Sequence, residues 1–361
     1  MVYLIVNIGS SSKKYALYHG DACVRAWHFE DTGEHGEEVL KEVDTQGARL
    51  DGIGFRVVHG GQYKESLKID EEVLGKLEAI RGLAPLHNGP ALAEIKRFME
   101  LRSTVPLVAV FDTSFHQTMP EYARRYALPE TLVTDPHHLV RYGFHGISYQ
   151  SIVQKTNHLL GFLPSRLIAC HLGAGTSMCA ILHGKSIDTS MGFTPLEGLI
   201  MGTRSGDIDP GIIFHVQKEF NFSADEMDHL LNSAAGLKGI AGDADVRNLI
   251  AREKQGDPSA TLALAMFSYR VRKYIGAYTA VLGGLDALVF TAAIGEGSPF
   301  MREKFCKGMG SLGIDLDRRA NARHTGDSEG EIGTATSPVK LLVLKTDEMG
   351  EIARQMHETI G

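Results

Sequence analysis

The sequence has little that would suit an oxidising compartment or a nucleic-acid partner. Only four cysteines occur in 361 residues, with no CxxC pair and no framework spacing, which is typical of reduced, buried thiols in a cytosolic protein. The formal net charge of −7 argues against a surface for nucleic acid, and it does not attract a small anionic substrate either. Arginines placed locally must therefore capture any anion that the protein binds.

An uncharged hydrophobic run of membrane-spanning length is also missing. The most apolar long segment, Thr261 to Leu285, contains Arg270, Arg272 and Lys273, so we expect it not to span a bilayer. Its pattern predicts a helix that is apolar on more than one side, buried in a core or in the interface of a homodimer. The first residues read as a strand, with no basic segment or cleavage site, so we expect a cytoplasmic protein.

The sequence lacks the pattern G-x-x-x-x-G-K-[ST], so an ATP site here is not a P-loop. Gly308-Met-Gly-Ser-Leu-Gly313 does satisfy G-x-G-x-x-G. However, it follows a helical pattern, whereas the dinucleotide-binding fingerprint requires a strand before it. We interpret this segment as the C-terminus of a helix.

An internal repeat is the most informative feature that is present. His171-Leu-Gly-Ala-Gly-Thr-Ser177 repeats Asn7-Ile-Gly-Ser-Ser-Ser-Lys13 in changed letters, at an offset of 164 residues. Each copy lies between two short apolar runs, which predicts a hairpin whose tip offers backbone N–H groups and hydroxyls to an anion. We therefore expect a duplicated domain with both tips facing one phosphate. Chance similarity of two Gly/Ser turns is the alternative.

Strand-like and helical runs alternate throughout, which predicts an α/β fold. Leu107 to Phe111 reads as a strand that ends in Asp112, and α/β folds place ligands at such strand ends. Leu83 to Pro90 reads as a loop fixed by two prolines. We expect the domain boundary near Asp112–Met119, with the terminal helix returning to the first half.

Two arginines are the strongest candidates for binding an anion. Arg204 lies in a glycine-flanked loop, where a guanidinium can bind an oxyanion through two parallel N–H bonds. The alternative is that Arg204 pairs with Asp207 or Asp209 and only holds a turn. Arg56 follows a strand and precedes His-Gly-Gly, which makes a simple surface role less attractive.

Several other side chains are candidates for metal or phosphoryl binding. Asp112 and Glu348 could anchor Mg²⁺, which typically takes one or two protein carboxylates, although Glu348 alone is more typical of an acid at a helix N-terminus. His145 could donate a hydrogen bond to a transferring phosphoryl group, although a lone histidine in an apolar loop is more often structural. His137-His138 look like a metal pair without a third ligand, and we interpret them as a solvated loop.

Eight motifs, spread over nearly the whole chain, resemble the acetate kinase (acetokinase) family. They are Asn7-x-Gly-Ser-Ser-Ser-x-Lys14, Arg56-Val-Val-His-Gly-Gly61, Ala84-Pro-Leu-His-Asn88, Phe111-Asp-Thr-Ser-Phe-His116, Arg141-Tyr-Gly-Phe-His-Gly146, Met191 through Pro210, Phe290-Thr-Ala-x-Ile-Gly-Glu296 and Thr346-Asp-Glu348. The resemblance implies two duplicated actin-like (ribonuclease H-like) α/β domains around a nucleotide cleft. It implies a first domain of 1–114 plus 349–361 with acyl-substrate residues, and a second of 115–348 with the nucleotide site and the probable dimer interface.

The resemblance also implies a reaction: reversible in-line phosphoryl transfer between ATP and acetate, giving acetyl phosphate and ADP, with Mg²⁺ or Mn²⁺. Arg56 and Arg204 would hold the carboxylate and the phosphoryl group, which His145 would hydrogen-bond. The metal residues would be Asn7, Asp112 and Glu348. The acyl pocket would comprise Val58, Leu86, Phe144 and Pro195, next to His87. The nucleotide residues would be Asn7, Ser10, Ser12, Lys14, His171, Gly173, Gly175, Asp245, Arg247, Gly295, Glu296 and Gly297.

Some positions depart from the family pattern. Ala174 and Gly297 stand where the family usually has Asn beside the nucleotide, Tyr149 replaces a usual His, and Gly89 looks inserted. The transfer chemistry is therefore a firmer inference than the phosphoryl donor. The alternatives are a pyrophosphate-forming acetate kinase, a propionate or butyrate kinase, and, from another class, a non-catalytic actin-like ATP-binding switch. The intact arginines and carboxylates speak against the switch.

Overall fold

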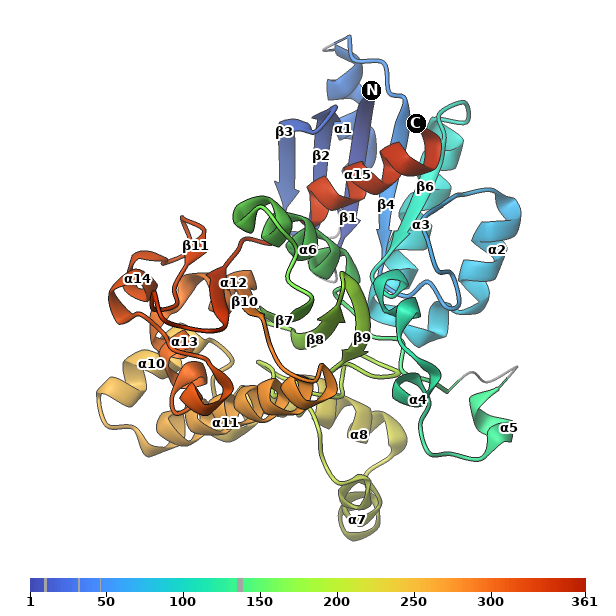
Figure 1. The fold of residues 1–361 in the computed structure, drawn as a ribbon. Helices are drawn as coiled ribbons and strands as arrows, with labels where there is room; N and C mark the ends of the chain where they lie inside the picture. Colours follow the sequence, from blue (N-terminus) through green and yellow to red (C-terminus); the bar gives the residue numbers. More distant parts are fainter. Residues whose placement is uncertain (10–11, 32, 46, 135–138) are drawn as a thin grey trace. The chain divides into compact units, whose positions relative to one another are not determined.

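The computed structural model describes residues 1–9, 12–31, 33–45, 47–134 and 139–361. The chain divides into two compact units (Figure 1). Unit 1 comprises Met1–Gln117, Phe144–Ser151 and Asp347–Gly361, and unit 2 comprises Thr118–Gly143 and Ile152–Thr346. The short segment Phe144–Ser151, which carries His145, therefore belongs to unit 1 although it lies far from the rest of that unit in sequence.

Unit 1 is built on a six-stranded mixed sheet in the order β3-β2-β1-β4-β6-β5. Its strands are β1 (Val2–Ile8), β2 (Lys13–His19), β3 (Ala22–Phe29), β4 (Gly52–Val57), β5 (Leu67–Lys68) and β6 (Leu107–Phe111). The first three strands form an antiparallel meander. β1, β4 and β6 run parallel to one another, and β5 pairs antiparallel with β6 at the edge.

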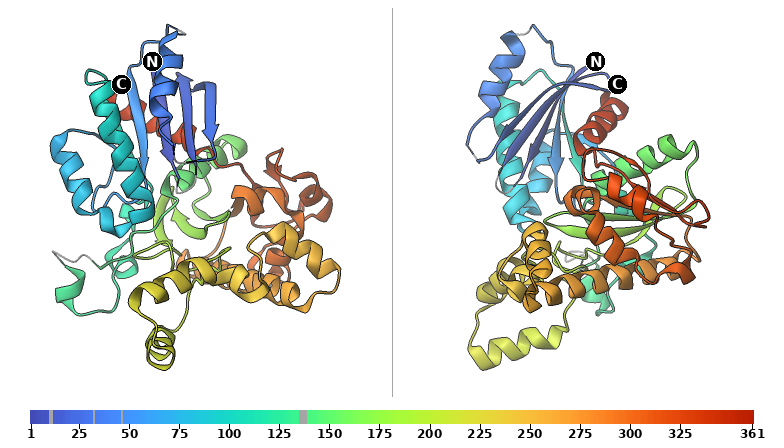
Figure 2. Two further views of the ribbon diagram at one scale, coloured as in Figure 1. Left: turned by 180° about the vertical axis from the view of Figure 1, so that it is seen from behind. Right: turned by 90° about the vertical axis from the view of Figure 1, so that its left-hand side faces the viewer.

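Helices cover both faces of this sheet. They are α1 (Gly36–Thr45), α2 (Glu71–Ala79) and α3 (Pro85–Leu101) on one face, and α15 (Glu348–Ile360) with the start of α6 (Gly146–Leu160) on the other. Successive side chains of β1 enter the two layers in turn: Leu4 and Val6 pack toward α1–α3, and Tyr3 and Ile5 toward α15. Figure 2 shows the blue strands between these helices. With both faces covered, the strand ends remain as the place for a site.

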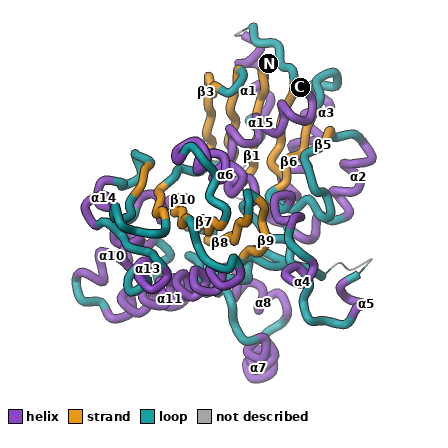
Figure 3. The backbone as a smooth tube through the Cα atoms, viewed as in Figure 1, coloured by secondary structure: helices purple, strands orange, loops and turns teal. Residues whose placement is uncertain are grey.

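Unit 2 repeats this topology. Its sheet has the order β11-β12-β10-β7-β8-β9, with strands β7 (Arg166–Leu172), β8 (Thr176–Leu182), β9 (Lys185–Thr189), β10 (Ala287–Thr291), β11 (Gly330–Glu331) and β12 (Lys340–Val343). Again an antiparallel meander is followed by two parallel strands and an antiparallel edge strand. Figure 3 shows the strands of both sheets in orange. The predicted duplication of an α/β domain is therefore confirmed.

The remaining helices belong mainly to unit 2. They are α4 (Glu121–Arg124), α5 (Glu130–Val133), α7 (Pro210–Phe220), α8 (Ala224–His229), α9 (Gly236–Ala241), α10 (Val246–Lys254), α11 (Pro258–Val281), α12 (Ala292–Gly297), α13 (Pro299–Cys306) and α14 (Arg318–Arg323). The long helix α11 buries Leu264, Phe267 and Val271 against the core around β7 and β10. None of the described helices is long and apolar enough to cross a membrane.

The sequence repeat aligns without a gap, but the two hairpins differ in the number of residues between their paired strands. In unit 1, Ile8 pairs with Lys13, so four residues of sequence separate the paired positions. In unit 2, Leu172 pairs with Thr176, so only three do. The letters of the repeat align at one constant offset, but the hydrogen-bonded register of the second strand is shifted by one residue, because ladder bonds rather than letters fix the turn length.

Two other expectations were wrong. Leu83 to Pro90 is not a loop, because α3 begins at Pro85 and includes Pro90. A proline in the first turn has no N–H that the helix needs, and Pro90 removes one intrahelical bond while the rest of α3 packs on the sheet. The cysteines are not all buried, since Cys23 is exposed on the edge strand β3.

Candidate active site

Three neighbouring parallel strands of unit 1 bring polar side chains to one edge of the sheet. Asn7 lies near the end of β1, Arg56 near the end of β4, and Asp112 directly after β6. The ladder pairs Val57 with Phe111, so the residues that flank them are neighbours across the sheet. The sequence placed Asp112 at a strand end where α/β folds bind ligands, and the structure adds that Asn7 and Arg56 lie at the same edge, because the three strands are parallel.

Arg56 is the centre of this group. Its Nη2 donates to Asp112 Oδ2 at 2.6 Å, and its Nε lies 3.2 Å from both oxygens of the same carboxylate. Its Nη1 donates to Asn7 Oδ1 at 3.3 Å and lies 3.7 Å from Glu348 Oε2, at the first residue of α15. The three side chains predicted to position the metal therefore surround one guanidinium.

Burial shifts the pKa values of the charged side chains in this group. Asp112 is almost fully buried, and that burial raises the pKa of its carboxyl, against the opposing effect of Arg56. Burial also lowers the pKa of Arg56, but Asp112 and Glu348 outweigh it and raise the pKa above its usual value. One guanidinium thus faces two carboxylates and an amide oxygen, a donor set that suits a hard cation.

His145 is tied to the same place through the backbone. It adopts a left-handed conformation with φ of 58°, which is uncommon for a residue other than glycine. The next residue, Gly146, donates its N–H to Asp112 O at 2.9 Å, and a Cβ on it would lie 2.2 Å from that oxygen. Only glycine permits this approach, so α6 starts against the chain at Asp112. Local strain of this kind is typical of functional sites.

The predicted acyl-pocket residues Val58 and Phe144 both belong to unit 1. Val58 directly follows the strand and is buried, and Phe144 is buried with its ring 5.8 Å from the His59 ring. Phe144 O is also 2.9 Å from His116 Nε2. His87 lies in the first turn of α3. The side chain of Leu86 lies outside the described part of the chain, as do Ser10 and His137-His138.

Arg204 belongs to unit 2 and differs sharply from Arg56. Its Nη1 donates to Pro195 O at 3.3 Å, and no carboxylate among the described residues lies within ion-pair distance of it. Asp207 accepts hydrogen bonds from elsewhere, and Asp209 caps α7 by accepting from Gly211 N. The turn-holding alternative is therefore excluded. Burial lowers the pKa of Arg204, but a guanidinium stays protonated, so this half-buried cation has no counter-ion among the residues that the structure describes.

The second hairpin lies beside the loop of Arg204. Gly202 N donates to Ala174 O at 3.3 Å, and so joins that loop to the hairpin tip. Within the tip, Gly173 N donates to Gly175 O at 3.2 Å. His171, at the end of β7, pairs with Ser177 across the ladder. The loop of Arg204 and the hairpin tip at 173–175, the two candidate phosphate-binding features of unit 2, are therefore joined by a backbone hydrogen bond.

Two other predicted nucleotide residues, Glu296 and Asp245, accept hydrogen bonds at the N-termini of helices. Glu296 Oε1 accepts from Ala292 N at 2.7 Å and from Thr346 N at 3.1 Å. Asp245 caps α10 and forms a 2.6 Å ion pair with Arg247, whose side chain is 90% exposed. In unit 1, Lys14 is exposed and Ser12 O accepts from Gly9 N.

Arg302 is a buried residue, not expected from the sequence, that binds the backbone of two predicted nucleotide residues. Its side chain is fully buried, and its Nη1 donates to Gly295 O at 2.7 Å and to Glu296 O at 2.8 Å. Its other nitrogens bind Asn321 and His324 O. Arg302 thereby fixes the 295–297 segment. An arginine in a helical run usually reads as a surface residue, so no sequence signal indicated its burial.

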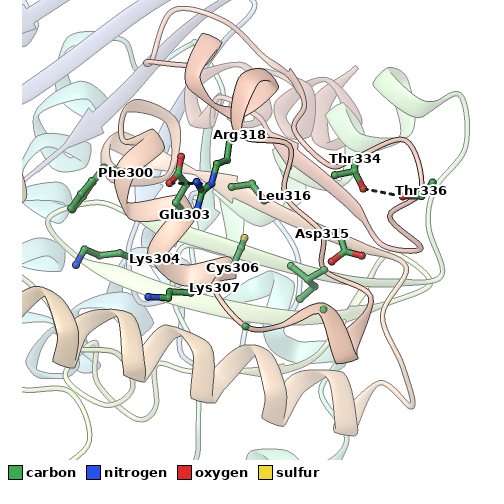
Figure 4. Close-up of a pocket in the computed structure, with 13 residues that line it drawn as sticks. Phe300, Glu303, Lys304, Cys306, Lys307, Asp315, Leu316, Arg318, Thr334 and Thr336 are labelled. Carbon is green, nitrogen blue, oxygen red and sulfur yellow. Dashed lines mark hydrogen bonds and ion pairs between the residues drawn. The ribbon is translucent and has the colours of Figure 1, made fainter.

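A cavity of about 770 Å³ lies elsewhere in unit 2, lined by residues of α13 and of the segments that follow it (Figure 4). None of the predicted site residues lines it. Its charged side chains are of both signs, and Lys304 is already paired with Glu253 at 2.8 Å. We therefore locate the candidate site by its chemistry and not by the volume of this cavity.

Comparisons with known proteins agree with the geometry. A model of the acetokinase family matches residues 28–354. The acetate kinase of Syntrophobacter fumaroxidans is 43% identical, over 100% of this chain and 97% of that protein. The crystal structure of Porphyromonas gingivalis acetate kinase has a TM-score of 0.91 and 35% identity, covering 100% of each chain. A propionate kinase from Francisella tularensis subsp. tularensis has a TM-score of 0.90 and 35% identity, covering 99% of each chain.

Proposed function

The chain belongs to the acetokinase family of phosphotransferases with a carboxyl group as acceptor, and on that premise we propose that it is an acetate kinase. The proposed reaction is reversible transfer of the γ-phosphoryl group of ATP to acetate, which gives acetyl phosphate and ADP. The contrast between Arg56 and Arg204 is the observation that carries this proposal. One arginine already has carboxylate partners, whereas the other is a half-buried cation that an incoming anion would neutralise.

The chemistry needs positioning and charge neutralisation rather than a base. A carboxylate is ionised at pH 7, so the acceptor needs no deprotonation before it attacks phosphorus. We assign Arg204 to the charge of the transferring phosphoryl group, Arg56 to the substrate carboxylate and His145 to a hydrogen bond with the phosphoryl oxygens. Held donors of this kind act on charge that develops in the transition state.

We further propose that Asn7, Asp112 and Glu348 hold Mg²⁺, or Mn²⁺ in its place. The described residues include no group of three His, Cys, Asp or Glu side chains that could hold a metal, so this assignment depends on two carboxylates and an amide. Magnesium usually keeps several water molecules and needs few protein ligands, which fits so small a set. When bound, the ion would neutralise charge on the phosphate oxygens. Arg56 would then release part of its hold on the carboxylates.

A propionate kinase is the second candidate within the family, because one of the similar solved structures carries that name. The buried Val58 and Phe144 favour a short acyl chain of two or three carbons over butyrate. Chain length is therefore best determined by direct competition among acetate, propionate and butyrate.

We also propose that the protein forms a homodimer through unit 2. Leu262, Met266 and Tyr269 of α11 are exposed, and the apolar helix α7 extends from unit 2 with no buried residue of its own (Figure 1). Phe214 on α7 is 71% exposed. Exposed apolar residues in this number on two helices favour a protein partner over water.

A hydroxamate assay tests the proposed reaction. Acetate, Mg²⁺ and ATP should give acetyl phosphate, and acetyl phosphate with ADP should give ATP. Formation of pyrophosphate from acetyl phosphate and phosphate, with no ADP-dependent activity, would overturn the donor but keep the acetate chemistry. Nucleotide binding with neither reaction would instead support the non-catalytic actin-like switch.

A further inference from the structure

The loop that carries Arg204 is closed at its base by a pair of residues. Asp207 N donates to Gly198 O at 3.0 Å, and Gly198 N donates to Asp207 Oδ1 at 2.8 Å. Gly198 has φ of 109°, and a Cβ there would lie 2.5 Å from Ser190 O. A side chain at position 198 would therefore clash, and the Asp207 carboxylate closes the base by accepting from Gly198 N.

Two side chains of helix α11 form hydrogen bonds with the base of this loop. Arg270 Nη1 donates to Gly198 O at 2.9 Å and lies 3.1 Å from Asp207 Oδ2, and Arg270 Nη2 donates to Asp207 O at 3.2 Å. One turn along the helix, the Tyr274 hydroxyl donates to Asp207 Oδ2 at 2.9 Å. Residues four apart lie on one face of a helix, so both side chains reach Asp207 together.

Arg270, Tyr274 and Asp207 together form a clamp at the base of the loop. Burial raises the pKa of Tyr274, and the neighbouring Asp207 raises it further, so the hydroxyl remains a donor. The opposite side of the loop has a separate backbone anchor, since Leu237 N donates to Met201 O at 2.9 Å and Ala235 N to Thr203 O at 3.1 Å.

The position of the Arg204 guanidinium depends on the backbone of its loop more than the position of an ion-paired arginine would. Its hydrogen bonds among the described residues are the 3.3 Å contact with Pro195 O and a long contact with Met201 Sδ. No carboxylate fixes it, so the loop backbone sets where its charge lies. A displacement of about 1 Å at a reacting group can cost on the order of 10²-fold in rate.

We propose that Arg270, Asp207 and Tyr274 are positioning residues, which act on phosphoryl transfer through Arg204 by holding its loop closed. The proposal rests on the proposed function, because it takes Arg204 as the residue that contacts the phosphoryl group. It gives α11 a role in turnover beyond its part in the core.

Tyr274→Phe removes a single hydroxyl from the clamp, and Tyr278→Phe is its matched control. Tyr278 lies one turn further along α11, is buried, and its hydroxyl has no hydrogen-bond partner among the described residues. We expect Tyr274→Phe to lower kcat by about tenfold, within the range set by misplacement, with KM for ATP unchanged. Tyr278→Phe should keep wild-type kcat. Asp207→Asn, with the melting temperature measured, provides a second variant and should lower kcat further. Equal kcat in Tyr274→Phe, Tyr278→Phe and wild type would overturn the proposal.

A double-mutant cycle with Arg204→Lys separates this inference from the proposed function. If the clamp acts through Arg204, Tyr274→Phe should change kcat by less than about twofold in the Arg204→Lys background, because coupled residues are non-additive. Full multiplication of the two effects would show that the clamp acts elsewhere, and would overturn the inference alone. A wild-type kcat for Arg204→Lys would instead overturn the assignment of Arg204 in the proposed function.

Discussion

Arg56 Nη2 donates a hydrogen bond to Asp112 Oδ2 at 2.6 Å, from the end of one parallel strand to the end of its neighbour. The pair is largely buried, and Asn7 and Glu348 complete its surroundings. This relationship gives Arg56 two functions, since it stabilises a buried carboxylate and also presents a guanidinium at the proposed site. Arg204 has only the second function.

The two arginines should therefore differ when each is replaced by alanine. Arg204→Ala should lower kcat on the order of 10³-fold, a value typical of a lost transition-state charge contact, with little change in melting temperature because no ion pair is broken. Arg56→Ala should lower kcat and also destabilise the fold by roughly 3–5 kcal/mol, because it leaves Asp112 buried and unpaired. Thermal unfolding measured beside kcat tests both. A folded Arg204→Ala with less than a tenfold loss would contradict its assignment.

Stability should fall in mild acid because of His59. Burial lowers the pKa of this fully buried histidine to about 4, below its ordinary value of 6.5. The unfolded chain therefore binds a proton before the native state does, and native stability is full above pH 6.5 and declines as the pH falls to 4. The loss is at most roughly 3 kcal/mol. Urea unfolding at pH 7, 5.5 and 4 should show this slope, and His59→Gln should flatten it. An identical slope in the variant would assign the acid sensitivity to other groups.

The acyl pocket should favour two or three carbons. Each methylene that a pocket rejects typically changes kcat/KM by about 10- to 200-fold. Val58→Ala removes two methyl groups at a buried position of the proposed pocket and should raise kcat/KM for butyrate relative to acetate. Butyrate turned over by the wild type as efficiently as acetate would contradict the assignment of these residues.

The nucleotide should be recognised less selectively than in family members with both asparagines. Ala174 and Gly297 lack side-chain amides that could each contribute roughly 0.5–1.5 kcal/mol. We expect a raised KM for ATP, with GTP and ITP working within about tenfold of it. Gly297→Asn should be tolerated, because a Cβ there meets only Thr325 O at 3.7 Å. Ala174→Asn should lower KM for ATP, and strict ATP selectivity in the wild type would show that other residues read the base.

The proposed dimer should be sensitive to charge on the exposed face of α11. Sedimentation at micromolar concentration should give twice the chain mass, and Tyr269→Glu together with Met266→Glu should give monomers. Both side chains are exposed in the single chain, so the folded monomer should keep its melting profile. A monomeric wild type would exclude the dimer.

The sequence by itself determined the features that depend on local pattern. Short apolar runs predicted the strands, and the repeat predicted the duplication. The position of Asp112 at a strand end was enough to predict a ligand-binding location, because α/β folds place ligands at such ends. That the strand of Arg56 is its parallel neighbour came from the structure.

Only the tertiary structure decided which charged groups pair. Sequence proximity left the pairing of Arg204 with Asp207 or Asp209 open as an alternative, but Asp207 is held by Arg270 and Tyr274, more than sixty residues away. The burial of Arg302 and the shorter turn of the second hairpin were likewise hidden. Charge pairing and burial depend on which surfaces of helices and loops come into contact, and packing between residues far apart in sequence decides this. The periodicity of a sequence indicates only which face of each element points toward the core.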